Sequence, residues 1–289
     1  MQLVCDHQCQ LGEGPIWDAP RKLICWIDIL RGEIHEYSPR YKTLKTHSVR
    51  QMVGTVGVCK DGEFIVALQN GFAFVNRETG QISMAHNPES HLLNNRFNDG
   101  KCDPAGRFWA GTMSLTEDPK AGSVYVFNNK TTIKKIGNVT ISNGLAWSLD
   151  HKTLYYIDTP TMEVVAYSFN KRTGNITNRK VIITVPKEDS YPDGMTIDSE
   201  GMLWIAHWDG WQVTRWNPHT GKKLSSISLP VARVTSCTFG GDDLTDLYIT
   251  SARVGLSEEA LSQQPLAGSL FVIPDIGVKG TDSFEFDKE

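Results

Sequence analysis

The sequence predicts an all-β fold, a six-bladed β-propeller with four-stranded antiparallel blades, and residues 1–289 are expected to form this single domain. The main observation is a short hydrophobic strand that recurs six times, each time after a turn. Its copies begin at residues 23, 64, 108, 154, 203 and 247, so the intervals are 41, 44, 46, 49 and 44 residues. A period of about 40–50 residues built from short strands is typical of propeller blades.

The residues around each recurring strand follow one plan. A turn with Asp and Gly precedes the strand, as at Asp103–Gly106 and Asp198–Gly201. A strand with aromatic residues follows, as at Val124–Phe127, and a Thr-Gly turn closes the repeat, as at Thr173–Gly174. Turn signals spaced about 8–12 residues apart fit four short antiparallel strands per blade.

The carboxyl-terminal part of the sequence predicts how the ring closes. One short helix is expected at Ser257–Leu261, with Ser257 as its N-cap and Pro265 beyond its end. The segment Ser269–Ile273 reads as a strand. We expect it to share one blade with the amino-terminal residues, because this pairing closes the ring and removes free sheet edges.

Composition and charge exclude several classes of function. The formal net charge is −4 with no basic patch, which argues against binding to nucleic acid or to an anionic membrane. No apolar run approaches the roughly 18 residues of a membrane span. The amino terminus shows no signal peptide, and the six cysteines include no Cys-x-x-Cys pair, so we expect reduced thiols and no thiolate zinc site. The prediction is a cytoplasmic monomer or weak dimer.

Oxygen-bearing side chains recur at one phase of the repeat. Counting ten or eleven residues back from each strand start gives Glu13, Gly54 (or Val53), Asn98, Asn143, Asp193 and Ser236 (or Cys237). Because blades pack radially, equivalent positions form a ring around one axis, and these side chains should converge at one end of the central channel. Carboxylate and amide oxygens suit Ca²⁺, Mg²⁺ or Mn²⁺. Each Asn-Gly or Asp-Gly alone is an ordinary turn, but the shared phase of Glu13, Asn143 and Asp193 favours a metal site.

The same segments carry a family resemblance. Matching stretches run from residue 12 to residue 280, namely Gly12–Pro15, Asn94–Lys101, Asp103–Arg107, Ala110–Met113, Ser142–Leu145, Tyr155–Asp158, Pro192–Met195, Phe239–Gly241 and Gly277–Gly280. With these motifs the chain resembles the six-bladed propellers of the senescence marker protein (regucalcin), gluconolactonase and luciferin-regenerating enzyme family. The resemblance is closest to the regucalcin branch.

The resemblance implies roles for individual residues. Glu13, Asn143 and Asp193 would bind one divalent metal ion, which could be Ca²⁺, Zn²⁺, Mn²⁺ or Mg²⁺. Arg96 and Asn98 would hold the substrate, and Asp193 would also serve as the catalytic acid/base.

The resemblance does not assign a single role to three further residues, Glu117, Asp99 and His207. In the regucalcin branch a Glu in the loop after the Ala-Gly-Thr-Met strand also reaches substrate. Here that position is Thr116, and Glu117 follows it, so Glu117 is the candidate substrate-binding residue and the loop of residues 114–122 a candidate lid. Asp99 is a second candidate base or a supporting residue. His207, beside the fifth recurring strand, is interpreted as structural.

The function that the resemblance implies is metal-dependent hydrolysis of sugar-acid lactones, as by a gluconolactonase. A lactone requires a polarised carbonyl, an activated water and a stabilised oxyanion, and the residues are consistent with all three needs. Two alternatives remain open at this point. One is a non-catalytic calcium-binding or regulatory propeller, and the other is a metal-dependent hydrolase of other esters.

Overall fold

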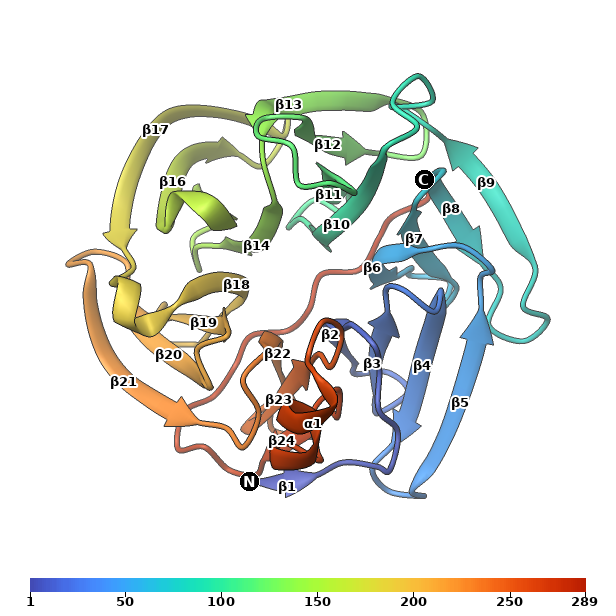
Figure 1. Ribbon diagram of the computed structural model, residues 1–289. Coiled ribbons are helices and arrows are strands. Elements are labelled where there is room, and N and C mark those ends of the chain that lie inside the picture. The colour runs from blue at the N-terminus through green and yellow to red at the C-terminus, as the bar shows by residue number, and fades with distance from the viewer.

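The computed structural model describes all residues 1–289, and it shows six four-stranded antiparallel sheets arranged around a central channel (Figure 1). The first blade contains β2 (Gly12–Asp18), β3 (Leu23–Asp28), β4 (Glu33–Ser38) and β5 (Thr43–Ser48), and the second contains β6 (Val53–Val58), β7 (Phe64–Leu68), β8 (Gly71–Val75) and β9 (Ile82–His86). The third contains β10 (Asn95–Cys102), β11 (Phe108–Ser114), β12 (Gly122–Phe127) and β13 (Thr132–Val139).

The remaining blades repeat this order from the channel outward. The fourth contains β14 (Ser142–Trp147), β15 (Thr153–Asp158), β16 (Glu163–Asn170) and β17 (Asn175–Thr184), and the fifth contains β18 (Tyr191–Ile197), β19 (Leu203–Trp208), β20 (Gln212–Asn217) and β21 (Lys222–Ser228). The sixth contains β22 (Val234–Gly240), β23 (Asp246–Ser251), β24 (Phe271–Ile273) and β1 (Gln2–Leu3). The predicted six-bladed propeller is confirmed, and each recurring strand is the second strand of its blade.

The ring closes as the sequence predicts. The amino-terminal strand β1 pairs antiparallel with β24, with Gln2 opposite Val272 and Leu3 opposite Phe271. The sixth blade therefore combines both ends of the repeat array, and β1 is its outermost strand. This pairing joins the last blade to the segment that leads into β2 of the first, so the ring has no gap at this junction.

The apolar core is divided among the junctions between blades. The buried apolar residues form six clusters, and each cluster draws its members from two neighbouring blades. In the third and fourth blades, for example, Trp109 and Trp147 meet edge to face with ring centroids 6.0 Å apart. Strands such as β7 and β11 are buried along their whole length because other blades cover both of their faces. This explains why the recurring strands read as continuous hydrophobic runs.

Aspartates in the turns between the first and second strands of a blade fix the start of the recurring strand. Asp103 Oδ1 accepts bonds from the backbone N–H groups of Ala105 (2.8 Å) and Arg107 (3.1 Å), and Asp103 Oδ2 accepts from Arg107 Nε (2.6 Å) and Trp109 Nε1 (2.9 Å). Both carboxylate oxygens are therefore fully used. The Gly at the end of this turn, Gly106, has a positive φ of 78°, which glycine adopts without strain.

Asp198 in the fifth blade repeats this arrangement. Asp198 Oδ1 accepts from the backbone N–H groups of Glu200 and Met202, both at 2.9 Å, and Asp198 Oδ2 accepts from Trp204 Nε1 (2.9 Å) and Arg215 Nε (2.8 Å). Two separate blades thus build the same turn from the same residue types, as expected for a structural repeat.

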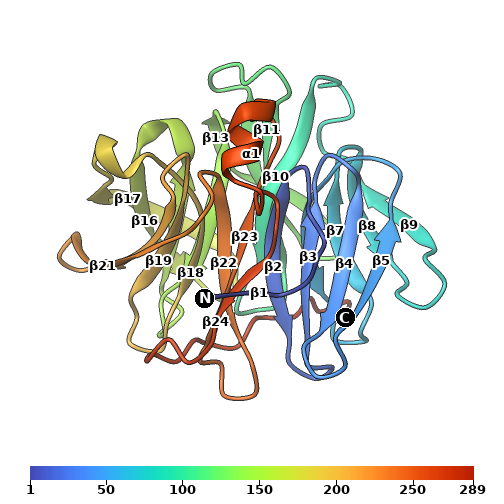
Figure 2. The same ribbon diagram turned by 60° about the horizontal axis from the view of Figure 1, so that its bottom comes forward.

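Different segments lie at the two ends of the channel (Figure 2). The helix α1 (Glu258–Gln263) lies at one end, and Ser257 caps it by accepting a bond from Ala260 N at 3.2 Å, as predicted. The carboxyl-terminal segment crosses the other end, where Gly280 bridges to Asp198 and the buried Phe286 bridges to Cys59. Two 3₁₀ turns, Thr159–Thr161 and Lys187–Asp189, complete the regular elements. None of these helices has the length and apolar character of a membrane span, and all six cysteines are free.

Candidate active site

All six innermost strands are irregular at the same level of the channel. Each shows a register shift against the second strand of its blade, at Glu13–Ile16, Val53–Thr55, Phe97–Gly100, Ser142–Leu145, Pro192–Met195 and Val234–Ser236. A bulge leaves a residue unpaired and redirects its side chain. The predicted site residues Asn98, Asn143 and Asp193 lie inside these irregularities, and Glu13 borders one. The four residues that occupy the same position of the sequence repeat therefore lie at the same irregularity of the innermost strands.

The structure brings together the three predicted metal ligands, which come from the first, fourth and fifth blades. Glu13, Asn143 and Asp193 are buried. The Asp193 carboxyl lies close enough to the side chains of Glu13 and Asn143 for both to act on its pKa. Asn143 Nδ2 donates to Thr159 Oγ1 at 3.0 Å, and this hydroxyl donates to the Pro192 carbonyl at 2.9 Å. The amide of Asn143 is thereby held in one orientation.

That orientation leaves one oxygen unsatisfied. Asn143 Oδ1 is buried and has no hydrogen-bond partner. A buried acceptor without a partner costs roughly 1–3 kcal/mol, so such an atom calls for a ligand. An amide oxygen beside two carboxylates is a donor set that suits a hard divalent cation.

The electrostatics of the two carboxyls point the same way. Burial raises the pKa of Glu13 well above its ordinary value, and the charges of Asp193 and Asp99 raise it further. Burial, followed by the charge of Asp99, likewise raises the pKa of Asp193 well above its ordinary value. Buried carboxyls that lie this close repel each other when ionised, and a bound cation would remove that repulsion. Glu13, Asn143 and Asp193 therefore fit a divalent metal ion.

The two predicted substrate residues form a connected pair on β10. Arg96 Nη1 donates to Asn98 Oδ1 (2.7 Å) and to the Phe97 carbonyl (2.9 Å), and Asn98 Nδ2 donates to the Ser142 carbonyl (2.8 Å). Both side chains are buried. Burial lowers the pKa of Arg96 to about 10, against the opposing effect of Glu13, Glu117 and Asp193. Both bonds of Arg96 use Nη1, so Nη2 and Nε remain available to a ligand.

In the loop between β11 and β12, Thr116 and Glu117 have different surroundings. Thr116 Oγ1 accepts from Asn94 Nδ2 (2.9 Å) and donates to Asp118 Oδ2 (2.7 Å), so this hydroxyl is used within the loop. Glu117 is exposed and has a positive φ of 55°. Its charge acts to raise the pKa of Arg96. The structure therefore places the charge of Glu117 near enough to act on Arg96, whereas the Thr116 hydroxyl is bonded within its own loop.

Asp99 lies one layer further along the channel. It lines a cavity of about 280 Å³ together with Lys101 and residues of the carboxyl-terminal segment. Its Oδ1 accepts from Gly100 N at 2.7 Å, and Lys101 Nζ donates to the Met195 carbonyl at 2.8 Å. Burial raises the pKa of Asp99. This position fits the supporting role better than that of a second base.

Sequence reasoning missed two residues that shape the site. Thr159 orients Asn143, and Lys101 faces Asp99. The signal for Thr159 was its place two residues after the strand that the sequence predicts at Leu154–Ile157. His207, interpreted as structural, is fully buried, and its Nε2 lies 2.6 Å from Thr214 Oγ1 within the same blade.

Comparison with known proteins places this architecture in a family. The family model described as "SMP-30/Gluconolactonase/LRE-like region" matches residues 11–253. Regucalcin from Gallus gallus is 39% identical over 292 residues, which cover 99% of this chain and 98% of that protein. The chain therefore belongs to the SMP-30/gluconolactonase/LRE-like family, which confirms the resemblance seen in its motifs.

Two solved structures agree with this placement. A luciferin-regenerating enzyme superposes with a TM-score of 0.91 at 32% identity, covering 97% of this chain and 96% of that one. A calcium-binding protein, regucalcin from Agrobacterium tumefaciens, superposes with a TM-score of 0.94 at 28% identity, covering 98% of this chain and 96% of that one. Coverage of this extent means that the whole propeller is shared.

Proposed function

We propose that this protein is a divalent-metal-dependent lactonase that hydrolyses sugar-acid lactones. The observation that carries the proposal is the unpartnered Asn143 Oδ1 next to the Glu13 and Asp193 carboxyls, beside the donor pair Arg96 and Asn98. Membership of a family whose description includes gluconolactonase supports this choice of substrate class.

Each residue has a chemical task in this proposal. A divalent cation held by Glu13, Asn143 and Asp193 would supply Lewis-acid polarisation of the lactone carbonyl. Asp193 accepts a proton from the attacking water as the water oxygen bonds to the carbonyl carbon. The ester bond to the ring oxygen then breaks, and Asp193 returns the proton to that oxygen to give the hydroxy acid. The water supplies both the hydroxyl and the proton, so the step is balanced.

The remaining residues position the sugar. Arg96 offers Nη2 and Nε to hydroxyl or carbonyl oxygens, and the bond from Arg96 Nη1 fixes the Asn98 amide. Glu117, at the rim of the site, can accept a bond from a further hydroxyl. The charges of Arg96 and Glu117 are opposite and Asn98 is neutral, so the three side chains together carry no net charge. Such a set of donors and acceptors suits a polyhydroxylated, uncharged lactone.

Hydrolysis of D-glucono-1,5-lactone, followed by acid release in weak buffer, tests the proposal. Chelator-stripped protein should show only the spontaneous rate, and Ca²⁺, Zn²⁺, Mn²⁺ or Mg²⁺ should restore turnover. Asp193→Ala should abolish turnover with every metal. Asp150→Asn is a matched control because Asp150 is exposed on the fourth blade. Folded protein that hydrolyses none of a panel of sugar lactones with any metal would contradict the proposal.

The name of one relative supports a second candidate. The Agrobacterium tumefaciens neighbour is described as a calcium-binding protein, and Glu13, Asn143 and Asp193 would equally serve a calcium-binding propeller without catalysis. Calcium binding by calorimetry together with no hydrolysis of lactones would favour it. Metal-dependent hydrolysis of simple esters but not of lactones would favour the other alternative, a hydrolase of different esters. The cytoplasmic location and the monomer or weak-dimer state stay predictions.

A further inference from the structure

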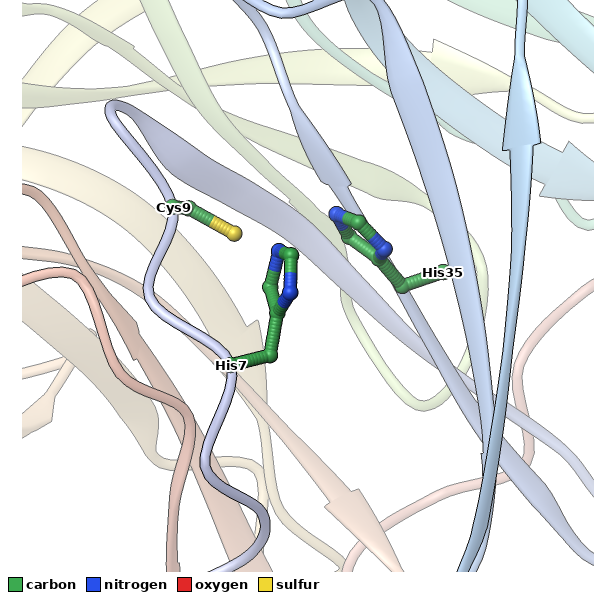
Figure 3. A group of neighbouring side chains, drawn as sticks. All are labelled: His7, Cys9 and His35. Carbon is green, nitrogen blue, oxygen red and sulfur yellow. The ribbon is translucent and has the colours of Figure 1, made fainter.

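A second cluster of metal-ligating side chains lies away from the channel, near the junction of the first and sixth blades. His7, Cys9 and His35 each offer one ligand atom, and these atoms all lie within 4.8 Å of one another. Figure 3 shows the Cys9 sulfur and the two imidazole rings gathered at one point. His7 and Cys9 belong to the segment that connects β1 to β2, and His35 lies on β4.

His35 is arranged as a metal ligand would be. Its side chain is fully buried, and Nδ1 lies 3.0 Å from Thr46 Oγ1, whereas Nε2 is buried and has no hydrogen-bond partner. When Nδ1–H donates to the threonine hydroxyl, Nε2 carries the free lone pair. Metal-binding histidines have this second hydrogen bond as a rule, because it fixes the ring and its tautomer.

The other two side chains complete this picture. Cys9 is fully buried, and Trp26 Nε1 lies 3.4 Å from its sulfur. An indole N–H can only donate, so the sulfur is the acceptor, as a metal-bound thiolate would be. His7 Nε2 is also buried without a partner. Two orphaned imidazole nitrogens and a buried thiol within one small volume are not explained by apolar packing.

Glu33 is the candidate fourth ligand, and its carboxylate, which lies outside the group of three, would have to move toward it. Its Oε2 lies 3.7 Å from His35 Nε2, and its charge acts on both His7 and Cys9. Asp28 also acts on both of them, and Arg31 opposes these two acids. A thiolate and one carboxylate would together balance the charge of a divalent cation.

We propose that His7, Cys9, His35 and Glu33 form a zinc site that is separate from the oxygen-rich site of the channel. Nitrogen and sulfur donors select zinc over calcium or magnesium. Ligand atoms around tetrahedral zinc lie roughly 3.3–3.7 Å apart, so the ligand atoms of His7, Cys9 and His35, now within 4.8 Å of one another, have to approach by about 1.5 Å at most. The sequence contains no Cys-x-x-Cys pair, and the expectation of no thiolate zinc site followed from spacing alone. Here the fold assembles the ligands from separate segments.

The position of the site assigns it a structural role. Cys9 N donates to the Gly268 carbonyl at 2.8 Å, so the segment that carries His7 and Cys9 is bonded to the sixth blade. His35 belongs to the first blade, and a zinc ion would therefore link the two blades at the point where the ring closes. Burial lowers the pKa of His35 to about 3, so its imidazole is neutral. Burial raises the pKa of the Cys9 thiol, so binding has to displace one proton.

Cobalt substitution tests the proposal, because a thiolate ligand gives Co²⁺ a near-ultraviolet charge-transfer band that oxygen ligands do not. Titration of the reduced, metal-stripped, full-length protein with Co²⁺ should produce this band, with one equivalent of Co²⁺ per chain contributing to it and any Co²⁺ in the channel site contributing none. The band should vanish in Cys9→Ser and persist in Cys5→Ser, the matched control from the same segment. It should also persist in Glu13→Gln, which weakens the channel site. Absence of the band in the unmodified protein, its survival in Cys9→Ser or its loss in Glu13→Gln would each overturn the proposal.

Thermal unfolding provides an independent readout. In the Glu13→Gln background, Zn²⁺ should raise Tm by several degrees, and this rise should disappear when Cys9→Ser or His7→Gln is added. His7 is only partly buried, so His7→Gln is expected to disturb the fold less than Cys9→Ser at the fully buried Cys9. An equal rise in Tm with and without the His7 substitution would show that zinc acts elsewhere.

Discussion

Two sets of buried carboxylates in this propeller have the same chemistry and opposite surroundings. Asp103 and Asp198, at the far turns of the third and fifth blades, each accept two backbone N–H bonds, one indole N–H bond and one guanidinium bond. Glu13 and Asp193, at the mouth of the channel, lie against each other with few donors around them, and burial raises the pKa of both.

The difference distinguishes carboxylates whose charge is compensated within the fold from carboxylates that we propose to bind a metal ion. Desolvation of the turn aspartates is offset by four hydrogen bonds each, so they stabilise the fold as they stand. The mouth carboxyls destabilise the metal-free fold when ionised, and a retained destabilising group is a sign of function. The arginines follow the same division, since Arg107 and Arg215 bond to the turn aspartates, whereas Arg96 bonds to Phe97 and Asn98.

Asp193→Asn should have the largest effect on activity and a small effect on stability. Loss of the acid/base group should lower lactone hydrolysis by at least about 100-fold. The metal-free protein should keep or gain stability, because one of two repelling buried carboxyls is removed. Initial rates and urea unfolding of chelator-treated protein measure both effects. A hydrolysis rate of Asp193→Asn within twofold of that of the unmodified protein would show that Asp193 is not the acid/base group.

Asp198→Ala should give the reverse result. Removing this carboxylate leaves Arg215, the Trp204 indole N–H and two backbone N–H groups without their acceptor, which should cost about 3–5 kcal/mol in the free energy of unfolding. Turnover per folded molecule should not change. Glu200→Ala is the matched control, because Glu200 is exposed and pairs with the same Arg215 at 2.5 Å, and it should cost less than about 1 kcal/mol. Urea unfolding followed by tryptophan fluorescence measures the two costs, and equal costs would contradict the argument.

Arg96→Lys should sharpen the comparison at the mouth. Lysine keeps the charge but lacks the planar set of donors that fixes Asn98 and that we propose to bind the substrate. We expect KM for the lactone to rise about 10-fold with kcat nearly unchanged and stability within about 1 kcal/mol. Steady-state kinetics over a range of lactone concentrations separates the two parameters. A fall in kcat with KM unchanged would place Arg96 in the chemical step instead.

The pH dependence of stability should have opposite signs in the two sets. Glu36, a third compensated carboxylate, bonds to His47 and to Arg77, and these bonds outweigh burial and lower its pKa to about 2. Its contribution is therefore present above its unfolded pKa of about 4.3 and is lost as the pH falls toward 2. Because Glu36, His47 and Arg77 all lose water on burial, we expect a net contribution on the order of 1 kcal/mol.

The mouth carboxyls act in the other direction. Their raised pKa values mean that the metal-free folded protein binds protons more tightly than the unfolded chain does, so their destabilising effect grows as the pH rises above their unfolded values of about 4. Urea unfolding of metal-free protein between pH 2 and 7 should show a shallower acid loss in Glu36→Gln. Asp193→Asn should instead raise stability at the upper end of this range. Identical pH profiles for the two variants would show that the carboxylates do not form two classes.

Much of the fold and part of the site could be predicted because the information is local or periodic. The recurring strands, the turns before them and the cap at Ser257 depend on neighbours within a few residues, and the fixed period placed Glu13, Asn143 and Asp193 at one level of the channel. The strands β15 and β23 begin within one residue of the predicted starts at Leu154 and Leu247.

The tertiary structure decided which polar groups are satisfied. Asp193 and Asp198 lie five positions apart in one strand-turn unit, yet only the fold gives Asp198 four donors and gives Asp193 the carboxyl of Glu13 from another blade. The bond from Asn143 Nδ2 to Thr159 likewise leaves Asn143 Oδ1 without a partner, and the closure of the ring gathers His7, Cys9 and His35 from different segments. The physical reason is that desolvation and charge compensation depend on distances in space, which a strand pattern in one chain does not specify.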